Sequence, residues 1–174
     1  MHLVIKTILY FLLSLTMASY GNSQQNIDTH ISETLKNRTI NEAYFEKKIK
    51  STKQLTNNEI KSLNLTIIKD INSDIYAKIK VIDTIFANQD TKFIIVAKES
   101  ENESTAYLVQ LDKSNKAIAF WLVYYADFVE YVSTTNTTIS DKLVTIITET
   151  EDFESGKQTT KTKSLKFKNG KLSK

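Results

Sequence analysis

After Leu65 the chain consists of short runs of β-branched and aromatic residues separated by brief polar turns, and this spacing limits the possible fold more than any other feature. Such runs are typical of β-strands. Parallel strands need crossover connections of about a dozen residues or more, which these turns do not provide. The sequence therefore predicts an antiparallel meander. We expect its strands at about 66–71, 75–86, 92–99, 104–111, 116–133, 138–150 and 158–168.

Turn composition and alternation support this prediction. The intervening segments carry the Asn, Asp, Ser or Gly residues that tight turns favour. In the segment 75–81 apolar residues alternate with Lys78 and Lys80, which predicts one buried face. The segment 117–125 is apolar on both faces and is expected at the centre of the sheet. We expect a bulge or turn near Ala126 and Asp127 to divide the long segment in two.

The residues before the sheet are expected to be helical. Apolar residues spaced four apart, starting at Ile27, predict a first helix near the start of the segment 26–50. Two capping boxes predict further helix starts, at Thr39 with Glu42 and at Thr56 with Glu59. The residues expected to face inward from these two helices are Ile40, Tyr44, Ile49, Ile60 and Leu63.

Together these patterns predict a single α+β domain at 24–174. Short N-terminal helices, a helical front at 26–64, are expected to pack on a curved antiparallel β-meander of about six or seven strands at 65–172. No linker rich in Gly, Ser or Pro divides the segment, and no internal repeat is evident.

The first residues have the layout of a secretory signal peptide. A lightly basic start is followed by the apolar run from Ile8 to Leu15 and then by small and polar residues, so we expect residues 1–23 to be removed on export. Small residues allow cleavage at positions between Gly21 and Gln24. The alternative is a retained anchor, but the uninterrupted apolar run is shorter than the about 20 residues that span a bilayer. The expected location is the periplasm or the extracellular space, with no membrane contact after cleavage.

Composition narrows the classes of partner. The chain has 174 residues and a formal net charge of +3, which becomes +2 when Lys6 leaves with the signal peptide. Arg38 is the single arginine, which argues against a nucleic-acid-binding protein. The abundance of Lys, Asn and Ile, with no Pro, is typical of an AT-rich bacterial genome. The absence of cysteine excludes disulfides and a lipid-modified N-terminal cysteine.

Most catalytic and metal-binding arrangements are missing from the sequence. His30 is the one histidine after the signal segment, and it is expected on the solvent-exposed side of a helix. Structural zinc needs several Cys or His ligands, and phosphate-binding loops need clustered glycines. We therefore expect no enzyme activity, no cofactor and no metal site.

Carboxylates are the remaining source of chemistry. Paired carboxylates hydrolyse glycosides, and oxygen-rich clusters bind calcium. This sequence has two acidic clusters, the first at Glu149, Glu151, Asp152 and Glu154 and the second at Asp70, Asp74, Asp83 and Asp90. The alternative interpretation of the first cluster is charge pairing across strands with Lys157, Lys161 and Lys163.

The densest group of aromatic residues lies between Phe120 and Tyr131. Most of it is expected in the core, because a central strand needs large side chains on both faces. The functional interpretation is a ligand-binding pocket or platform formed by Trp121, Tyr125 and Tyr131, where these face outward.

The sequence thus favours an exported, non-catalytic binding or accessory domain of unknown specificity. Its expected partner is a protein or a small apolar ligand. Two alternatives remain open: a hydrolase that uses acidic residues alone, and an inhibitor or immunity protein directed at an exported toxin or protease.

Overall fold

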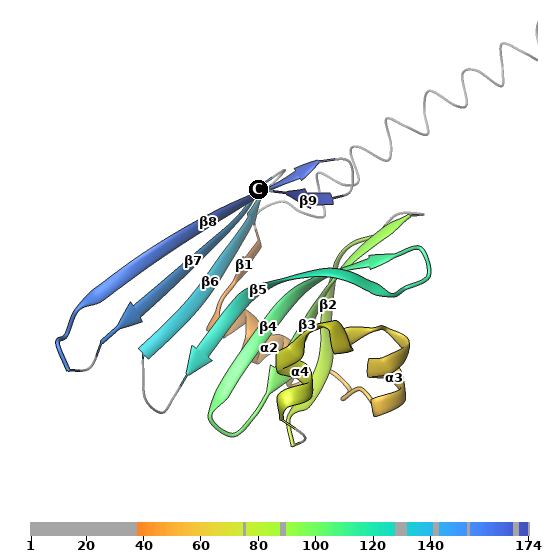
Figure 1. The fold of residues 1–174 in the computed structure, drawn as a ribbon, viewed down its shortest axis with the longest axis horizontal. Coiled ribbons are helices and arrows are strands. Elements are labelled where there is room, and N and C mark those ends of the chain that lie inside the picture. The colour runs from red at the N-terminus through yellow and green to blue at the C-terminus, as the bar shows by residue number, and fades with distance from the viewer. Residues whose placement is uncertain are drawn as a thin grey trace, which may run out of the picture. The chain divides into compact units, whose positions relative to one another are not determined.

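The computed structural model describes residues 38–74, 76–87, 90–127, 132–140, 143–152, 154–168 and 171–173 (Figure 1). All of them belong to one unit of the chain, Leu35–Lys174. They form an antiparallel sheet of nine strands and a few short helices. The strands are β1 (Arg38–Ile40), β2 (Lys78–Ala87), β3 (Thr91–Glu99), β4 (Glu103–Asp112), β5 (Ala117–Asp127), β6 (Val132–Ser140), β7 (Leu143–Glu151), β8 (Gln158–Lys168) and β9 (Lys171–Ser173). The helices are α2 (Glu42–Ile49), α3 (Asn57–Ser62), the 3-10 turn η1 (Leu65–Ile67) and α4 (Lys69–Ser73).

The predicted antiparallel meander is confirmed. Strands β2 to β9 follow one another in the sheet in sequence order, and β1 joins separately by pairing with β6. The predicted number of six or seven strands is wrong, because β1 and β9 span three residues each and are too short to show a periodic pattern. The boundaries expected for 116–133 and 138–150 also change. Strand β5 ends at Asp127, and the later residues form two strands, β6 and β7.

The strand predicted at 66–71 is not formed. Leu65, Ile68 and Ile71 are buried and spaced three apart, which is a helical repeat, and this segment forms η1 and α4. Asn64 begins the turn with a φ of 55°, in the left-handed region that asparagine tolerates better than most residues. Helical residues therefore extend beyond the predicted boundary at residue 64.

The N-terminal boundary of the described helices also differs from the prediction. Thr39 lies in strand β1 and does not cap a helix, whereas Asn41 accepts the backbone N–H of Tyr44 and begins α2. The predicted capping box of Thr56 and Glu59 is confirmed at the start of α3. The helix expected around Ile27 lies outside the described residues.

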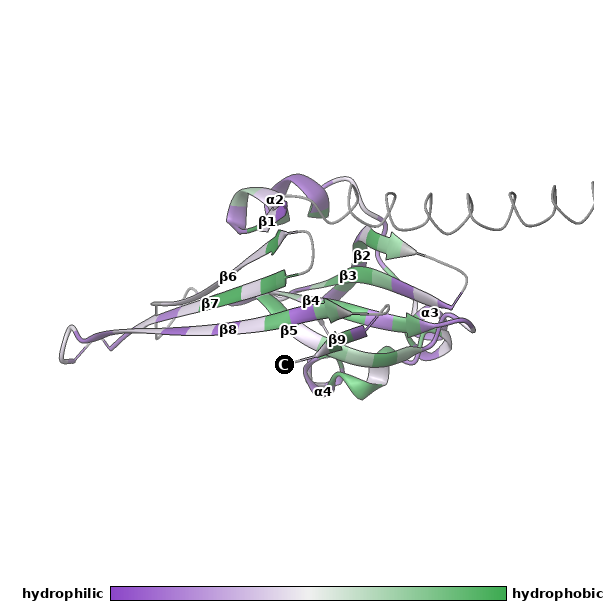
Figure 2. Ribbon diagram, turned by 90° about the horizontal axis from the view of Figure 1, so that it is seen from above, coloured by the Kyte–Doolittle hydropathy of each residue, from purple (hydrophilic) through white to green (hydrophobic). Residues whose placement is uncertain are grey.

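Strands β3 and β4 bury side chains on both faces of the sheet. On one face, η1 and α4 pack against an apolar cluster. We call this the α4 face, and the opposite one the α2 face. Figure 2 shows α2 and α4 on opposite sides of the strands β2 to β5. The α4-face cluster consists of Leu65, Ile68, Ile71, Ala77, Ile79, Ile94, Val96, Tyr107, Val109, Leu111 and Ala117.

Aromatic rings cover the α2 face. Phe45 of α2 stacks on Tyr124 of β5, with ring centroids 4.8 Å apart. Phe167 of β8 contacts Phe93 of β3 and Phe86 of β2, at centroid distances of 5.1 and 5.7 Å. The sheet therefore folds back on itself, because β8 reaches β2 and β3 although several strands separate them in the sheet order.

Candidate functional site

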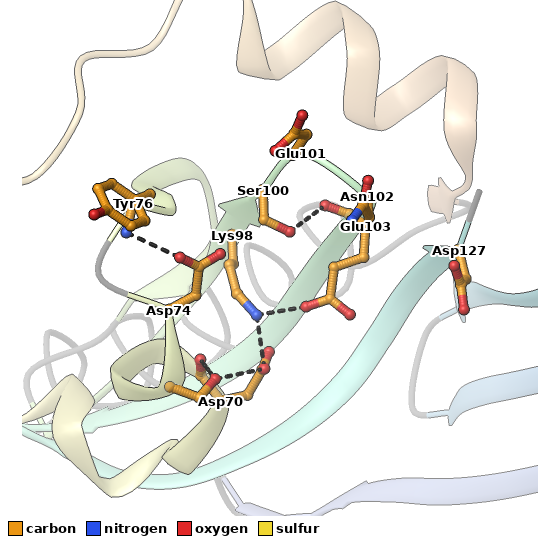
Figure 3. A pocket seen from close by; sticks show the side chains of 10 residues that line it. Asp70, Asp74, Tyr76, Lys98, Ser100, Glu101, Asn102, Glu103 and Asp127 are labelled. Atoms are coloured by element: carbon orange, nitrogen blue, oxygen red, sulfur yellow. Dashed lines mark hydrogen bonds and ion pairs between the residues drawn. The ribbon is translucent and has the colours of Figure 1, made fainter. Parts of the chain in front are cut away.

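A polar pocket of about 420 Å³ opens beside Lys98 of β3 (Figure 3). It is formed by α4, the residues that follow α4, the β3–β4 turn and the end of β5. Carboxylates dominate its lining, which consists of Asp70, Ser73, Asp74, Tyr76, Lys98, Ser100, Glu101, Asn102, Glu103 and Asp127.

The Lys98 side chain is the centre of this pocket and is only 3% exposed. Its Nζ lies 2.8 Å from Oδ1 of Asp70 and also donates to Glu103, so two carboxylates neutralise it (Figure 3). The hydroxyl of Tyr107 donates to the second oxygen of Asp70 at 2.6 Å. The three elements α4, β3 and β4 thus meet in one hydrogen-bonded cluster.

Electrostatics keeps Lys98 and Asp70 ionised. Burial alone would lower the pKa of Lys98, but the hydrogen bonds to Asp70 and Glu103 outweigh it and raise the pKa above its ordinary value. Burial would raise the pKa of Asp70, yet the bonds from Lys98 and Tyr107 lower it. A lysine held protonated in this way is a poor nucleophile or base, so its geometry favours anchoring.

Lys98 was not identified by the sequence analysis. It continues the alternation of Ile94 and Val96, whose side chains are buried on the α4 face. A charged residue at the next inward position of such a strand is the pattern that indicates a buried ion pair.

A second ionic cluster lies around Asp83 on the α2 face. The Asp83 carboxylate accepts from Arg38 of β1 at 2.9 Å and from the Tyr44 hydroxyl at 2.6 Å. Lys48 of α2 lies 3.1 Å away. Asp83 pairs with Ile95 in the sheet, an odd number of positions from Lys98, so the two clusters lie on opposite faces. The single arginine of the chain therefore serves to fasten β1 to β2.

The structure does not assemble the predicted aromatic platform in the described residues. Trp121 pairs with Leu108 and stacks on Phe93, with ring centroids 6.4 Å apart. Tyr125 pairs with Thr105, which is an odd number of positions from Leu108 on the regular strand β4. Trp121 and Tyr125 therefore face opposite sides of the sheet, whereas Tyr131 lies outside the described residues.

Tyr125 instead contacts Asp127, one of the residues that line the pocket beside Lys98. Its hydroxyl lies 3.3 Å from Oδ2 of Asp127, at the end of β5. Burial, followed by the Asp127 charge, raises the pKa of Tyr125 above its ordinary value. Tyr125 is the one predicted aromatic residue that the structure brings next to a described pocket lining.

The carboxylates at the end of β7 do not form the expected charge pairs. Glu149 pairs with Thr160 and Glu151 with Gln158, whereas Lys161 and Lys163 stand opposite Thr148 and Ile146. The predicted cross-strand pairing with these two lysines is therefore wrong by one residue of register, which moves a side chain to the other face. Asp152 accepts backbone N–H groups of Glu154 and Ser155 and so shapes the β7–β8 turn. The hollow next to it, about 170 Å³, is lined by Thr134, Glu149, Thr150, Glu151, Gln158, Thr159 and Thr160.

The other acidic cluster of the sequence is divided between sites. Asp70 and Asp74 line the pocket beside Lys98, while Asp83 belongs to the cluster on the α2 face. Asp90 is exposed at the start of β3. His30 lies outside the described residues.

An apolar row on β5 is the remaining feature of interest, and the sequence analysis missed it. Ile118, Phe120 and Leu122 are 55%, 39% and 37% exposed along one strand, and the register with β4 skips Ile118. Phe120 and Leu122 pair with Val109 and Tyr107 and therefore lie on the α4 face. The helices that cover this face contact β5 at its start, since the carbonyl of Leu63 accepts the N–H of Ala117 at 2.8 Å. The cover thus ends before Phe120.

Comparisons with protein-family models, with curated proteins and with solved structures found no match. Within the described ranges, no helix is long and apolar enough to cross a bilayer. The same residues contain no group of three or more His, Cys, Asp or Glu side chains placed to bind a metal ion.

Replacing Lys98 by methionine tests its anchoring role. Loss of one member of a buried ion pair leaves carboxylates without their counter-charge, and Asp70 and Glu103 remain 34% and 30% exposed. We therefore expect a loss of about 3 kcal/mol in the free energy of unfolding, at the low end for such pairs. Urea unfolding measures it. The matched control is Lys50→Met, whose partner Glu46 is 3.9 Å away on the surface, with an expected loss below about 0.5 kcal/mol. Equal losses in the two variants would contradict the anchoring role.

Acid should weaken the attachment of β1 and α2 through Asp83. Burial would raise the pKa of Asp83, but the bonds from Tyr44 and Lys48 and the Arg38 charge lower it below its ordinary value. A carboxyl whose pKa is lower in the folded chain stabilises fully above its unfolded value of about 4 and loses this effect as the pH falls through the folded pKa.

We expect Tyr44→Phe to move the Asp83 titration to higher pH, as followed by NMR of the carboxyl carbon. The control is Tyr76→Phe, which changes a hydroxyl on a residue that is 87% exposed. An Asp83 titration that is unchanged in Tyr44→Phe would show that the Tyr44 hydroxyl does not hold the carboxylate.

Proposed function

We propose that this chain is an exported, non-catalytic binding or accessory domain that engages a protein partner through the apolar row of β5. The observation that carries the proposal is the exposure of Ile118, Phe120 and Leu122 on one strand. Large apolar side chains gathered on a surface are typical of interaction sites. Full burial of one such side chain contributes about 1.5–3 kcal/mol, so covering the exposed parts of three supplies a few kcal/mol.

The charged lining of the pocket beside Lys98 makes a small apolar ligand a less favourable partner than a protein. Charged groups dominate its lining, and an apolar molecule placed there would remove water from carboxylates without replacing their hydrogen bonds. Exposed apolar side chains on β5 instead suit a broad, complementary surface. An inhibitor or immunity protein acting on an exported toxin or protease is one form of this proposal, since such proteins act by binding alone.

Hydrolysis by carboxylates is less well supported. Lys98 donates to one oxygen each of Asp70 and Glu103, and Tyr107 donates to the second oxygen of Asp70, so three of the four oxygens already accept hydrogen bonds. The alternative site around Glu149, Glu151 and Asp152 includes one carboxylate that holds a turn. We propose that the chain uses no cofactor or metal and binds no nucleic acid.

Export is tested on native material from the producing cells. Intact mass and N-terminal sequencing should find a protein outside the cytoplasm that begins between Asn22 and Gln24, because the small residues before these positions suit a signal peptidase. Full-length chain with Met1, recovered from the cytosol alone, would contradict export.

Photo-crosslinking tests the binding surface. A photoreactive phenylalanine analogue in place of Phe120 should capture a discrete partner protein in the producing cells, identified by mass spectrometry. The matched control carries the analogue in place of Ile147 of β7, which is 37% exposed. Absence of an adduct from position 120, or the same adducts from both positions, would contradict the proposed surface.

A further inference from the structure

Strand β5 has an open edge next to its apolar row. The ladder with β4 extends along the strand with register shifts at Ile118 and Val123, but β6 pairs with β5 only at Tyr125 and Ala126. Beyond these positions β6 pairs with β1, through residues 137–139. Among the described residues, no strand pairs with residues 118–122 of β5 on the side away from β4. Unpaired main-chain groups at such an edge are a template for a further strand.

Both ends of this gap are closed. At its start, the carbonyl of Leu63 accepts the N–H of Ala117, and the side-chain amide of Asn64 donates to the Ala117 carbonyl at 3.0 Å. At its end, β6 takes the edge at Tyr125. These two limits restrict pairing at this edge to a short extended segment, and they block continued growth of the sheet by long strand pairing.

Parts of two other sheet edges carry a form of protection that residues 118–122 of β5 lack. The outer edge of β2 is bridged by Gln54 opposite Lys80, and the neighbouring Leu55 N–H donates to the Ile79 carbonyl. Strand β8 pairs with β9 only at its end, and its remaining edge carries Lys161 and Lys163. Lysines on an exposed edge discourage pairing with another chain. The β5 edge has neither form of protection, because residues 117–126 carry no charge.

We propose that residues 118–122 of β5 bind an extended segment of the partner protein as an added strand. This inference rests on the proposed function, since it specifies how the partner occupies the same row. Main-chain hydrogen bonds supply affinity in strand addition, and alternate side chains supply specificity. The segment would carry apolar residues at alternate positions to cover Phe120 and Leu122.

A second copy of the chain fits this surface less well. The exposed parts of the three row side chains amount to on the order of a few hundred Å², whereas a stable interface buries about 800 Å² on each partner. The closed ends of the gap also prevent two β5 strands from pairing along their full length. A flexible segment can enter the gap without a large matching surface.

The test uses the full chain and a synthetic peptide of alternating Val and Thr, with Glu at one end and Lys at the other for solubility. Peptide binding is followed by NMR of isotope-labelled protein. We expect chemical-shift changes and slowed amide exchange within 118–122. The control peptide carries N-methyl groups on alternate amides, which removes the donors needed for strand pairing, and should bind at least about tenfold more weakly.

A variant pair tests the position. Leu122→Lys places a charge at the edge, as β8 does naturally, and should weaken peptide binding at least about tenfold. The control is Ile147→Lys, because both residues are 37% exposed but β7 pairs with strands on both sides. Equal unfolding midpoints for the two variants confirm that both are folded.

Three outcomes would overturn the inference. They are equal binding of the N-methylated peptide, shift changes confined to other strands, and a dimeric chain that Leu122→Lys makes monomeric. The last outcome would assign the edge to a second copy. If position 120 captures a partner while the peptide fails, strand addition is wrong and the proposed function stands; if position 120 captures nothing, the proposed function itself fails.

Discussion

Strands β3 and β4 bury side chains on both faces of the sheet, so other parts of the chain must pack on each face as a cover. This constraint determines how the rest of the chain is placed. Each cover is tied to the sheet by one ionic cluster. Lys98 holds α4 through Asp70 on one face, while Asp83 holds β1 and α2 through Arg38 and Lys48 on the other. Hydrogen bonds within these clusters offset the free-energy cost of removing the charges from water. The clusters therefore fix the positions of α4, β1 and α2 on the sheet more than they add net stability.

The apolar row follows from where one cover stops. The α3–η1 turn is hydrogen-bonded to β5 at Ala117, through Leu63 and Asn64. Strand β6 then leaves β5 after two pairs and continues beside β1. Consequently, among the described residues no strand pairs with Phe120 and Leu122 on the side away from β4, and both side chains remain partly exposed. The same divergence of strands thus exposes both the side chains and the main-chain edge, which is why we assign them to one binding surface.

Local patterns predicted much of the sheet, because turn residues and alternation act over a few positions. The strand at 158–168 has the predicted limits, and the capping box of Thr56 starts α3 as expected. The strand predicted at 66–71 is wrong, since a short apolar run fits either period and Leu65, Ile68 and Ile71 have helical spacing. Sites formed by distant residues were not predictable: the Asp70–Lys98 pair and the divergence of β5 from β6 depend on three-dimensional pairing that no short motif records.

The central claim is that the β5 edge is open in the isolated chain. Residue-resolved amide hydrogen exchange on the purified monomer tests it directly. The account predicts that amides within 118–122 that point away from β4 exchange rapidly, while amides of β3 and β4 remain protected. Protection across 118–122 equal to that of β4, in a chain shown to be monomeric by sedimentation, would contradict it.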